Sequence, residues 1–113
     1  PEARLPAHIE VSALLRRTQA AGGFATVLKK GEAEAGTLMV VLTHNGTGTR
    51  AYERMPQIDG SRAWTVSRLQ DIEKPQEFGE YLERRGKQDG DLWILELDIA
   101  NGEQLIGLNP YRT

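Results

Sequence analysis

The sequence predicts an α+β domain in which a mostly antiparallel sheet of about five strands carries two helices packed on one face. Three observations support this prediction. Segments with helical spacing alternate with runs of strand-forming residues, two Asn-Gly pairs mark tight turns, and short connections favour antiparallel neighbours. The expected element order is α-β-β-β-β-α-β, and a chain of 113 residues suits one domain over residues 1–113.

The first helix is expected from His8 to Ala21, where apolar residues recur at spacings of three and four. Gly22 and Gly23 follow it and supply the left-handed conformation that commonly ends a helix. The next segment, "FATVLKK", is the first expected strand. The segment "TLMVVLTH" is apolar on both faces, which predicts a strand in the middle of the sheet.

The second half of the chain supplies the remaining elements. Asn45 and Gly46 give a strong hairpin signal and lead into "TRAYERM", which "PQIDGSR" connects to the next strand, "AWTVSRL". Pro75 fits the first turn of the second helix. In "DLWILELDIA" the apolar residues alternate on one face while Glu96 and Asp98 lie on the other, and this alternation predicts the last strand.

Arginines and aromatic residues interleave along two of the expected strands. Alternation places three of them on one face of the first strand: Arg50, Tyr52 and Arg54. Four residues share a face of the second strand: Arg62, Trp64, Val66 and Arg68. If the two sets meet on the open side of the sheet, the arginines and aromatic rings form a platform that binds a planar or anionic ligand by stacking and charge-assisted hydrogen bonds.

A structural interpretation of the same residues competes with this one. Trp64 could be a core residue, and the arginines could pair across strands with Glu96 and Asp98, each pair contributing only about 0.2–1 kcal/mol. The excess of ten arginines over four lysines is also what a GC-rich genome produces. The strand order decides between the two interpretations, and the sequence does not reveal it.

Several classes of function find no support in the sequence. A net charge of −2 disfavours nucleic acid as a partner, and no apolar run approaches the ~20 residues of a membrane helix. The N-terminus lacks the pattern of a signal peptide, so we expect a cytoplasmic protein. There is no cysteine, and the two histidines, His8 and His44, lie outside any metal-binding motif, so we expect no metal and no cofactor.

The leading hypothesis is a small non-enzymatic binding module that presents the arginine-aromatic surface to a protein or to a small anionic ligand. It assigns no catalytic residue. The alternative is a small enzyme in which Glu96 or Asp98 acts as general base beside an arginine anion clamp. Because an open sheet has two edges, a homodimer formed through a sheet edge is a further expectation.

Five stretches of the chain together resemble one protein family: "RLPAHIEVSALLRRTQAAGGFATVLKKG", "AYERMPQIDG", "RAWTVSR", "PQEF" and "DLWILELDIA". The family is a small alphaproteobacterial one, the domain of unknown function number fourteen-ninety-one. The resemblance implies a cytoplasmic bacterial protein of one domain. It implies no activity, cofactor or catalytic residue, and so it leaves the function to the residues themselves.

Overall fold

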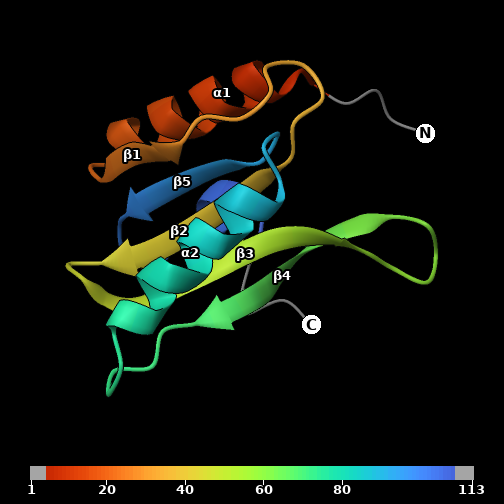
Figure 1. Cartoon of the computed structure of the whole chain (residues 1–113). Helices are drawn as coiled ribbons and strands as arrows, with labels where there is room; N and C mark the ends of the chain where they lie inside the picture. Colours follow the sequence, from red (N-terminus) through yellow and green to blue (C-terminus); the bar gives the residue numbers. More distant parts are fainter. Residues whose placement is uncertain (1–4, 109–113) are drawn as a thin grey trace.

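A computed structural model describes residues 5–108 of the chain (Figure 1). The elements are α1 (Ala7–Ala20), β1 (Phe24–Lys29), β2 (Leu38–His44), β3 (Thr47–Pro56), β4 (Arg62–Leu69), α2 (Gln76–Gln88), β5 (Trp93–Asp98) and the short 3-10 helix η1 (Gly102–Ile106). The predicted order α-β-β-β-β-α-β is confirmed, and η1 follows it. Both ends of the predicted domain, residues 1–4 and 109–113, lie outside the described residues.

The five strands form one sheet in the order β1-β5-β2-β3-β4. The pairs β1–β5, β2–β3 and β3–β4 are antiparallel, whereas β2 and β5 run parallel. The predicted α+β class with a mostly antiparallel sheet is therefore confirmed. The parallel pair arises because the chain returns across the sheet through α2 after β4, and β5 then enters beside β2 in the same direction. This return leaves β2 in the middle of the sheet, as its apolar sequence predicts.

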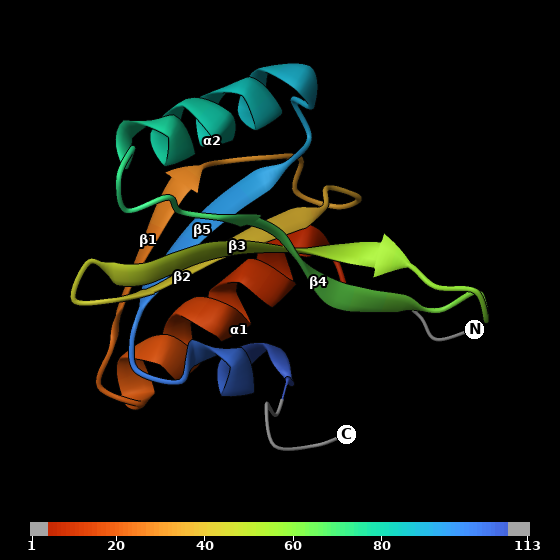
Figure 2. The same ribbon diagram turned by 90° about the horizontal axis from the view of Figure 1, so that it is seen from below.

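The two helices lie on opposite faces of the sheet (Figure 2), so the prediction that both pack on one face was wrong. α1 packs on the face that carries Leu38 and Val40, and α2 packs on the face that carries Met39 and Val41. The reason lies in β2, which is buried at every position except its last. Alternate residues of a strand point to opposite faces, so each face of β2 needs its own cover.

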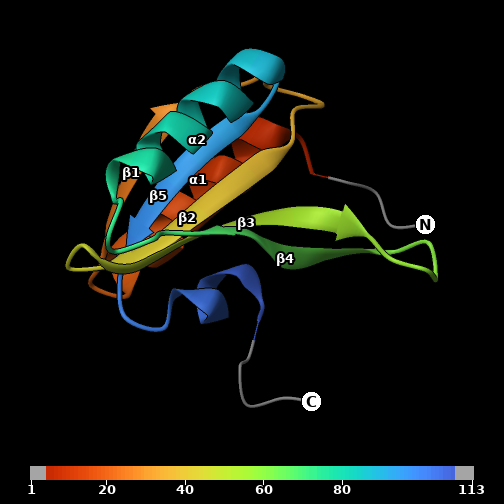
Figure 3. The same ribbon diagram turned by 60° about the horizontal axis from the view of Figure 1, so that its bottom comes forward.

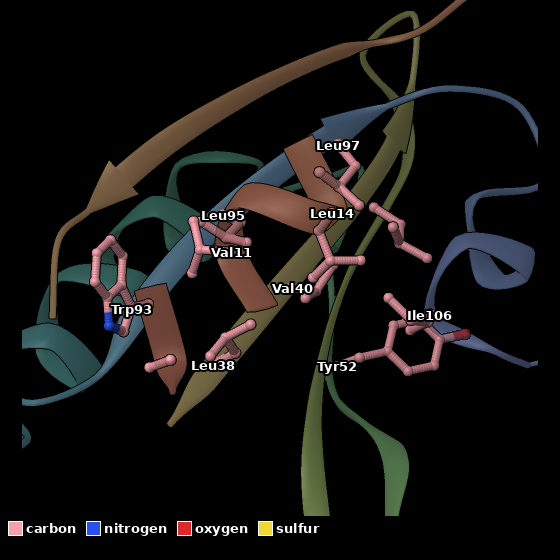
Figure 4. Packing of buried hydrophobic residues seen from close by; sticks show 11 residues of the cluster. Val11, Leu14, Leu38, Val40, Tyr52, Trp93, Leu95, Leu97 and Ile106 are labelled. Atoms are coloured by element: carbon pink, nitrogen blue, oxygen red, sulfur yellow. The ribbon is translucent and has the colours of Figure 1, made fainter. Parts of the chain in front are cut away.

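The larger core lies between α1, η1 and the sheet (Figure 4). It brings together Leu14 of α1, Leu95 and Leu97 of β5, and Ile106 of η1. Thr18 is buried at the end of the same helical face, and its hydroxyl donates a hydrogen bond to the Leu14 carbonyl at 2.8 Å. The one buried polar side chain of α1 is thus satisfied within the helix.

The turns that end α1 and join β2 to β3 have the conformations that the sequence predicts. Gly22 has a φ of +90°, and the Gly23 amide donates to the Thr18 carbonyl at 2.9 Å, which closes the end of the helix. Asn45 and Gly46 have φ values of 53° and 77°. Positive φ at both positions is the geometry of a two-residue hairpin turn, so the predicted hairpin is confirmed.

β3 and β4 continue beyond the start of β2 as a two-stranded arm (Figure 3). β2 begins at Leu38, and its Met39 lies opposite Glu53 of β3. β3 runs three residues further, to Pro56, which still pairs with Arg62 of β4. The root of the arm therefore stands beside the region where α1 and β2 begin.

Along α2, all of which lies in the described part of the chain, Phe78 is the one buried side chain. We expect Phe78→Ala to lower the free energy of unfolding by about 3–5 kcal/mol, because it removes the contact that anchors α2 to its face of the sheet. Urea denaturation followed by circular dichroism measures this loss.

Ile72→Ala is the matched control, because Ile72 precedes α2 and is 84% exposed. This substitution is expected to change the free energy of unfolding by no more than about 0.5 kcal/mol. A loss smaller than about 1 kcal/mol for Phe78→Ala would mean that this contact does not hold α2 on the sheet.

Candidate functional site

The six arginine and aromatic candidates do not form one platform, and a bulge in β4 is one cause. Tyr52 of β3 lies opposite Val66, but the preceding residue, Ala51, lies opposite Arg68, so Ser67 is an extra residue in β4. A bulge of this kind moves the following side chain to the other face. The expectation that Arg68 shares a face with Arg62 and Trp64 was therefore wrong.

Arg50 and Tyr52 hold η1 against β3. The Arg50 Nε donates to Glu103 Oε2 at 2.7 Å, and the Tyr52 hydroxyl donates to the same oxygen at 2.9 Å. Burial raises the pKa of Tyr52, and the bond with Glu103 raises it further. Burial would also raise the pKa of Glu103, but the hydrogen bonds that it accepts, first among them the bond from Arg50, hold that pKa below its ordinary value. Both candidates are thus engaged within the chain.

Arg54 lies between α1 and Trp64. Its guanidinium pairs with the Glu10 carboxylate of α1, and its Cζ lies 4.5 Å from the centroid of the Trp64 ring. Trp64 is partly buried and packs against the core beneath α1. A planar cation stacked on an indole face is favourable, and the carboxylate offsets its charge. Two of the six candidates therefore lie together, with Glu10 as a partner that the sequence analysis missed.

On the opposite face of the sheet, Glu53 of β3 binds α2. The Arg85 Nη2 donates to Glu53 Oε1 at 2.6 Å, and this bond raises the pKa of Arg85. The Tyr81 hydroxyl donates to Glu53 Oε2 at 3.4 Å and to Ser67 Oγ at 3.2 Å. Arg68 completes the group, with its Cζ 5.3 Å from the centroid of the Tyr81 ring. These contacts join β3, β4 and α2.

The carboxylates that neutralise the arginines are not the ones that the structural interpretation expected. It paired the arginines with Glu96 and Asp98, whereas the partners in the described residues are Glu10, Glu53 and Glu103. These three lie in α1, β3 and η1, so their proximity to the arginines depends on the strand order and on which face each helix covers. The one local signal was the position of Glu103 directly after a predicted Asn-Gly turn.

A groove of about 1000 Å³ opens beside the root of the arm. Its walls are the beginning of α1, the beginning of β2, the arm itself and the end of α2. Its charged lining residues are the arginines Arg54, Arg62 and Arg85 and the carboxylates Glu10, Glu53 and Asp89. Positive and negative groups are equal in number, so the groove carries no excess of either charge.

Arg62 differs from the other two arginines of the groove. Arg54 and Arg85 are half-buried and each has an intramolecular carboxylate partner. Arg62 is exposed at the start of β4 and makes no ion pair with any residue between 5 and 108. A ligand can therefore bind its guanidinium without breaking an ion pair within these residues.

Glu96 and Asp98 lie together on the α2 face of β5, as alternation predicts. Asp98 has a structural role there, because its Oδ1 accepts a hydrogen bond from the Asn45 amide at 2.8 Å and so fixes the turn between β2 and β3. Neither residue lines the groove or the smaller apolar hollow of about 380 Å³ between β1 and α2. A general base at either position would act outside both concave sites.

Within residues 5–108, no three histidine, aspartate or glutamate side chains are placed to hold a metal ion. The two histidines lie apart, with His8 at the start of α1 and His44 at the end of β2. Neither α1 nor α2 has the length and apolar character that crossing a membrane requires.

The lowered pKa of Glu103 makes the stability of the fold depend on pH. Its ionised carboxylate stabilises the folded state above its ordinary pKa of 4.5, and the stabilisation is lost as the pH falls through the lower folded-state pKa. We expect Glu103→Gln to lower the free energy of unfolding at neutral pH by about 1–3 kcal/mol. We also expect it to flatten the decline between about pH 5 and about pH 3.

Urea denaturation at three pH values measures both effects, with Glu80→Gln on the exposed side of α2 as the control. If the wild type and the Glu103→Gln variant lose equal stability between about pH 5 and about pH 3, the Arg50–Glu103 contact is not the source of the dependence.

Comparisons with known proteins agree on one family. The family model described as "Protein of unknown function (DUF1491)" matches residues 5–107. A crystal structure of a DUF1491 protein from Caulobacter crescentus is similar with a TM-score of 0.77 and 30% identity, over 92% of this chain and 96% of that one. A solution structure from A. tumefaciens has a TM-score of 0.72 and 33% identity, over 91% and 92%.

No curated protein matches the chain. The family match covers most of the sequence, and the two solved structures share its fold along nearly their whole length. The resemblance found in the sequence is thus confirmed, and the chain belongs to the DUF1491 family.

Proposed function

We propose that the protein is a non-enzymatic binding module and that its ligand occupies the groove beside the root of the arm. The observation that carries this proposal is the convergence of Arg54, Arg62 and Arg85 on one groove of about 1000 Å³. Ligand sites are typically concave, with a few convergent polar groups that fix the orientation of the ligand. The groove has this character.

The proposal narrows the six candidate residues to the two that line the groove, Arg54 and Arg62. Arg62 is the primary contact because it is exposed, lines the groove and makes no ion pair within residues 5–108. Arg54 is held in place in the wall of the groove, since its guanidinium pairs with Glu10 and lies over the indole of Trp64. Trp64 does not line the groove itself. Arg50 and Tyr52 stabilise η1 instead, and Arg68 lies on the α2 face.

The charge balance of the groove favours a polypeptide segment over a small anion. A multiply charged anion would meet the carboxylates of Glu10, Glu53 and Asp89 together with the arginines. A peptide carries donors and acceptors along its length, so it can satisfy both kinds of group, and one acidic side chain can pair with Arg62. We therefore propose a protein partner that inserts a segment with at least one acidic residue.

The alternative enzyme has no observation in its favour, because Glu96 and Asp98 lie outside the groove and Asp98 already bonds the Asn45 amide. We propose the cytoplasm as the location of this binding module. Fractionation of the native host tests the location independently of the ligand.

A peptide library selected on the immobilised wild-type protein tests the proposal. We expect the selected peptides to share an acidic residue and the Arg62→Glu variant to bind them about 10–100-fold more weakly, since a charge-assisted hydrogen bond contributes about 1.5–3 kcal/mol. Replacing the acidic residue of the peptide by lysine is expected to restore binding to Arg62→Glu, because the pair of charges is then reversed.

Arg84→Glu is the matched control, because Arg84 is exposed on α2 next to Arg85 and does not line the groove. It changes the net charge by the same amount as Arg62→Glu. Equal weakening by the two variants would mean that the peptides respond to net charge and would contradict a site at the groove. If no peptide is selected, and small organic anions tested separately bind the wild type but not Arg62→Glu, the ligand of the groove is a small anion and the proposed protein partner is wrong.

A further inference from the structure

The two edges of the sheet differ in their protection against pairing. The outer strand β4 carries Arg62 and Arg68 and contains the bulge at Ser67. The outer strand β1 bears no charge from Phe24 to Leu28, and its one register shift lies between Val27 and Lys29, where Leu28 is an extra residue. Charges and bulges are the devices that keep an edge strand from joining another sheet. β1 lacks them over most of its length.

β1 also exposes apolar side chains. Phe24 is 75% exposed, Leu28 46% and Val27 38%. Phe24 and Thr26 lie opposite Asp98 and Glu96, so they point to the α2 face. Leu28 lies on that face too, since it lines the apolar hollow between β1 and α2.

The sequence of β1 is complementary to itself in one antiparallel register. If two copies pair with Thr26 opposite the partner's Thr26, Phe24 lies opposite the partner's Leu28 and Ala25 lies opposite the partner's Val27. Each of these pairs joins side chains on the same face, because Ala25 and Val27 both face α1 and the other residues face α2. A shift by one residue would oppose side chains of different faces.

The apolar hollow gives Phe24 a place to bind in the second copy. The hollow has a volume of about 380 Å³ and is lined by Leu28, Leu82 and Ile94 together with Gly79 and Gly86 of α2, and three charged residues complete its lining: Lys29, Glu83 and Lys87. A Cβ atom at Gly79 would meet nothing within 4 Å, so no contact within residues 5–108 explains this glycine. Glycine within a helix costs about 1 kcal/mol relative to alanine, and a ring seated in the hollow would use the space that it leaves.

The charges at the two ends of the strand suit the same register. The Nζ of Lys29, at the end of β1, donates to the Gly90 and Leu92 carbonyls of its own chain, so the exposed Lys30 that follows is the lysine that can face a second copy, whereas the beginning of β1 pairs with β5 at Asp98. Antiparallel pairing brings the lysine end of each copy to the Asp98 end of the other. The uncharged middle is thus flanked on each side by opposite charges, which favours this register over a slipped one.

We propose that β1 is a dimerisation edge, through which two copies join their sheets with Phe24 of each copy seated in the apolar hollow of the other. The contact involves one short strand and one ring from each copy. Such a contact is small compared with the roughly 1,600 Å² of a standard interface, so we expect dissociation in the micromolar range. The groove beside the arm lies toward the opposite edge of the sheet, which ends at β4, so it stays open in this dimer.

Sedimentation equilibrium over a concentration series from about 5 to about 500 μM tests the proposal, since it spans the expected dissociation constant. We expect the wild type to pass from monomer to dimer and Thr26→Lys to remain monomeric, because two lysines would then face each other across the two-fold axis. Within each copy the new lysine lies opposite Glu96, so the fold is kept. Thr65→Lys on the exposed edge strand β4 is the control and should dimerise as the wild type does.

A wild type that is monomeric over the whole series, or a Thr26→Lys variant that dimerises as the wild type does, overturns the proposal. Disulfide cross-linking tests the register. The sequence contains no cysteine, so an introduced cysteine can link only to its counterpart in a second copy. Opposite residues in an antiparallel pair have Cβ atoms about 4.5–5.5 Å apart, so oxidation should link Thr26→Cys into a covalent dimer. Equal linking of Thr26→Cys and the control Thr65→Cys would contradict pairing through β1.

Discussion

The central strand β2 must be covered on both faces, and the arrangement of the other elements follows from this requirement. Its residues are buried from Leu38 to Thr43, with alternate side chains pointing to opposite sides of the sheet. α1 covers one side directly. The chain reaches the other side by crossing the sheet through α2 after β4, and this crossing returns β5 parallel to β2. The requirement thus explains both the two-sided fold and the single parallel pair.

β3 is connected by polar contacts to the elements on both faces of the sheet, whereas the contacts of β2 with both faces are apolar. Glu53 of β3 holds Arg85 of α2, while Arg50 and Arg54 of β3 hold the carboxylates of Glu103 and Glu10 on the other face. Each contact ties one helix to the same strand. The arginines that suggested a ligand surface are therefore mostly structural, and Arg62 remains as the groove arginine that serves no ion pair within residues 5–108.

Local chemistry explains which parts of this structure the sequence predicts. The Gly22 helix end, the Asn45-Gly46 turn and the central position of β2 depend on conformational preference and on hydrophobic pattern, and all three are confirmed. The side of the sheet taken by each helix depends on contacts between distant segments, which no local pattern encodes. The bulge at Ser67 has no signal in an alternating strand, and it alone moved Arg68 out of the predicted surface.

An NMR map of the backbone amides that shift when a selected acidic peptide is added at neutral pH tests the central claim most directly. A groove that binds the ligand predicts shifts confined to the arm from Met55 to Arg62, to the beginning of α1 and to the end of α2. The chemical shifts of the amides around Glu96 and Asp98 should not change. Shifts centred on those two carboxylates would contradict the account and favour an active site on the α2 face of β5.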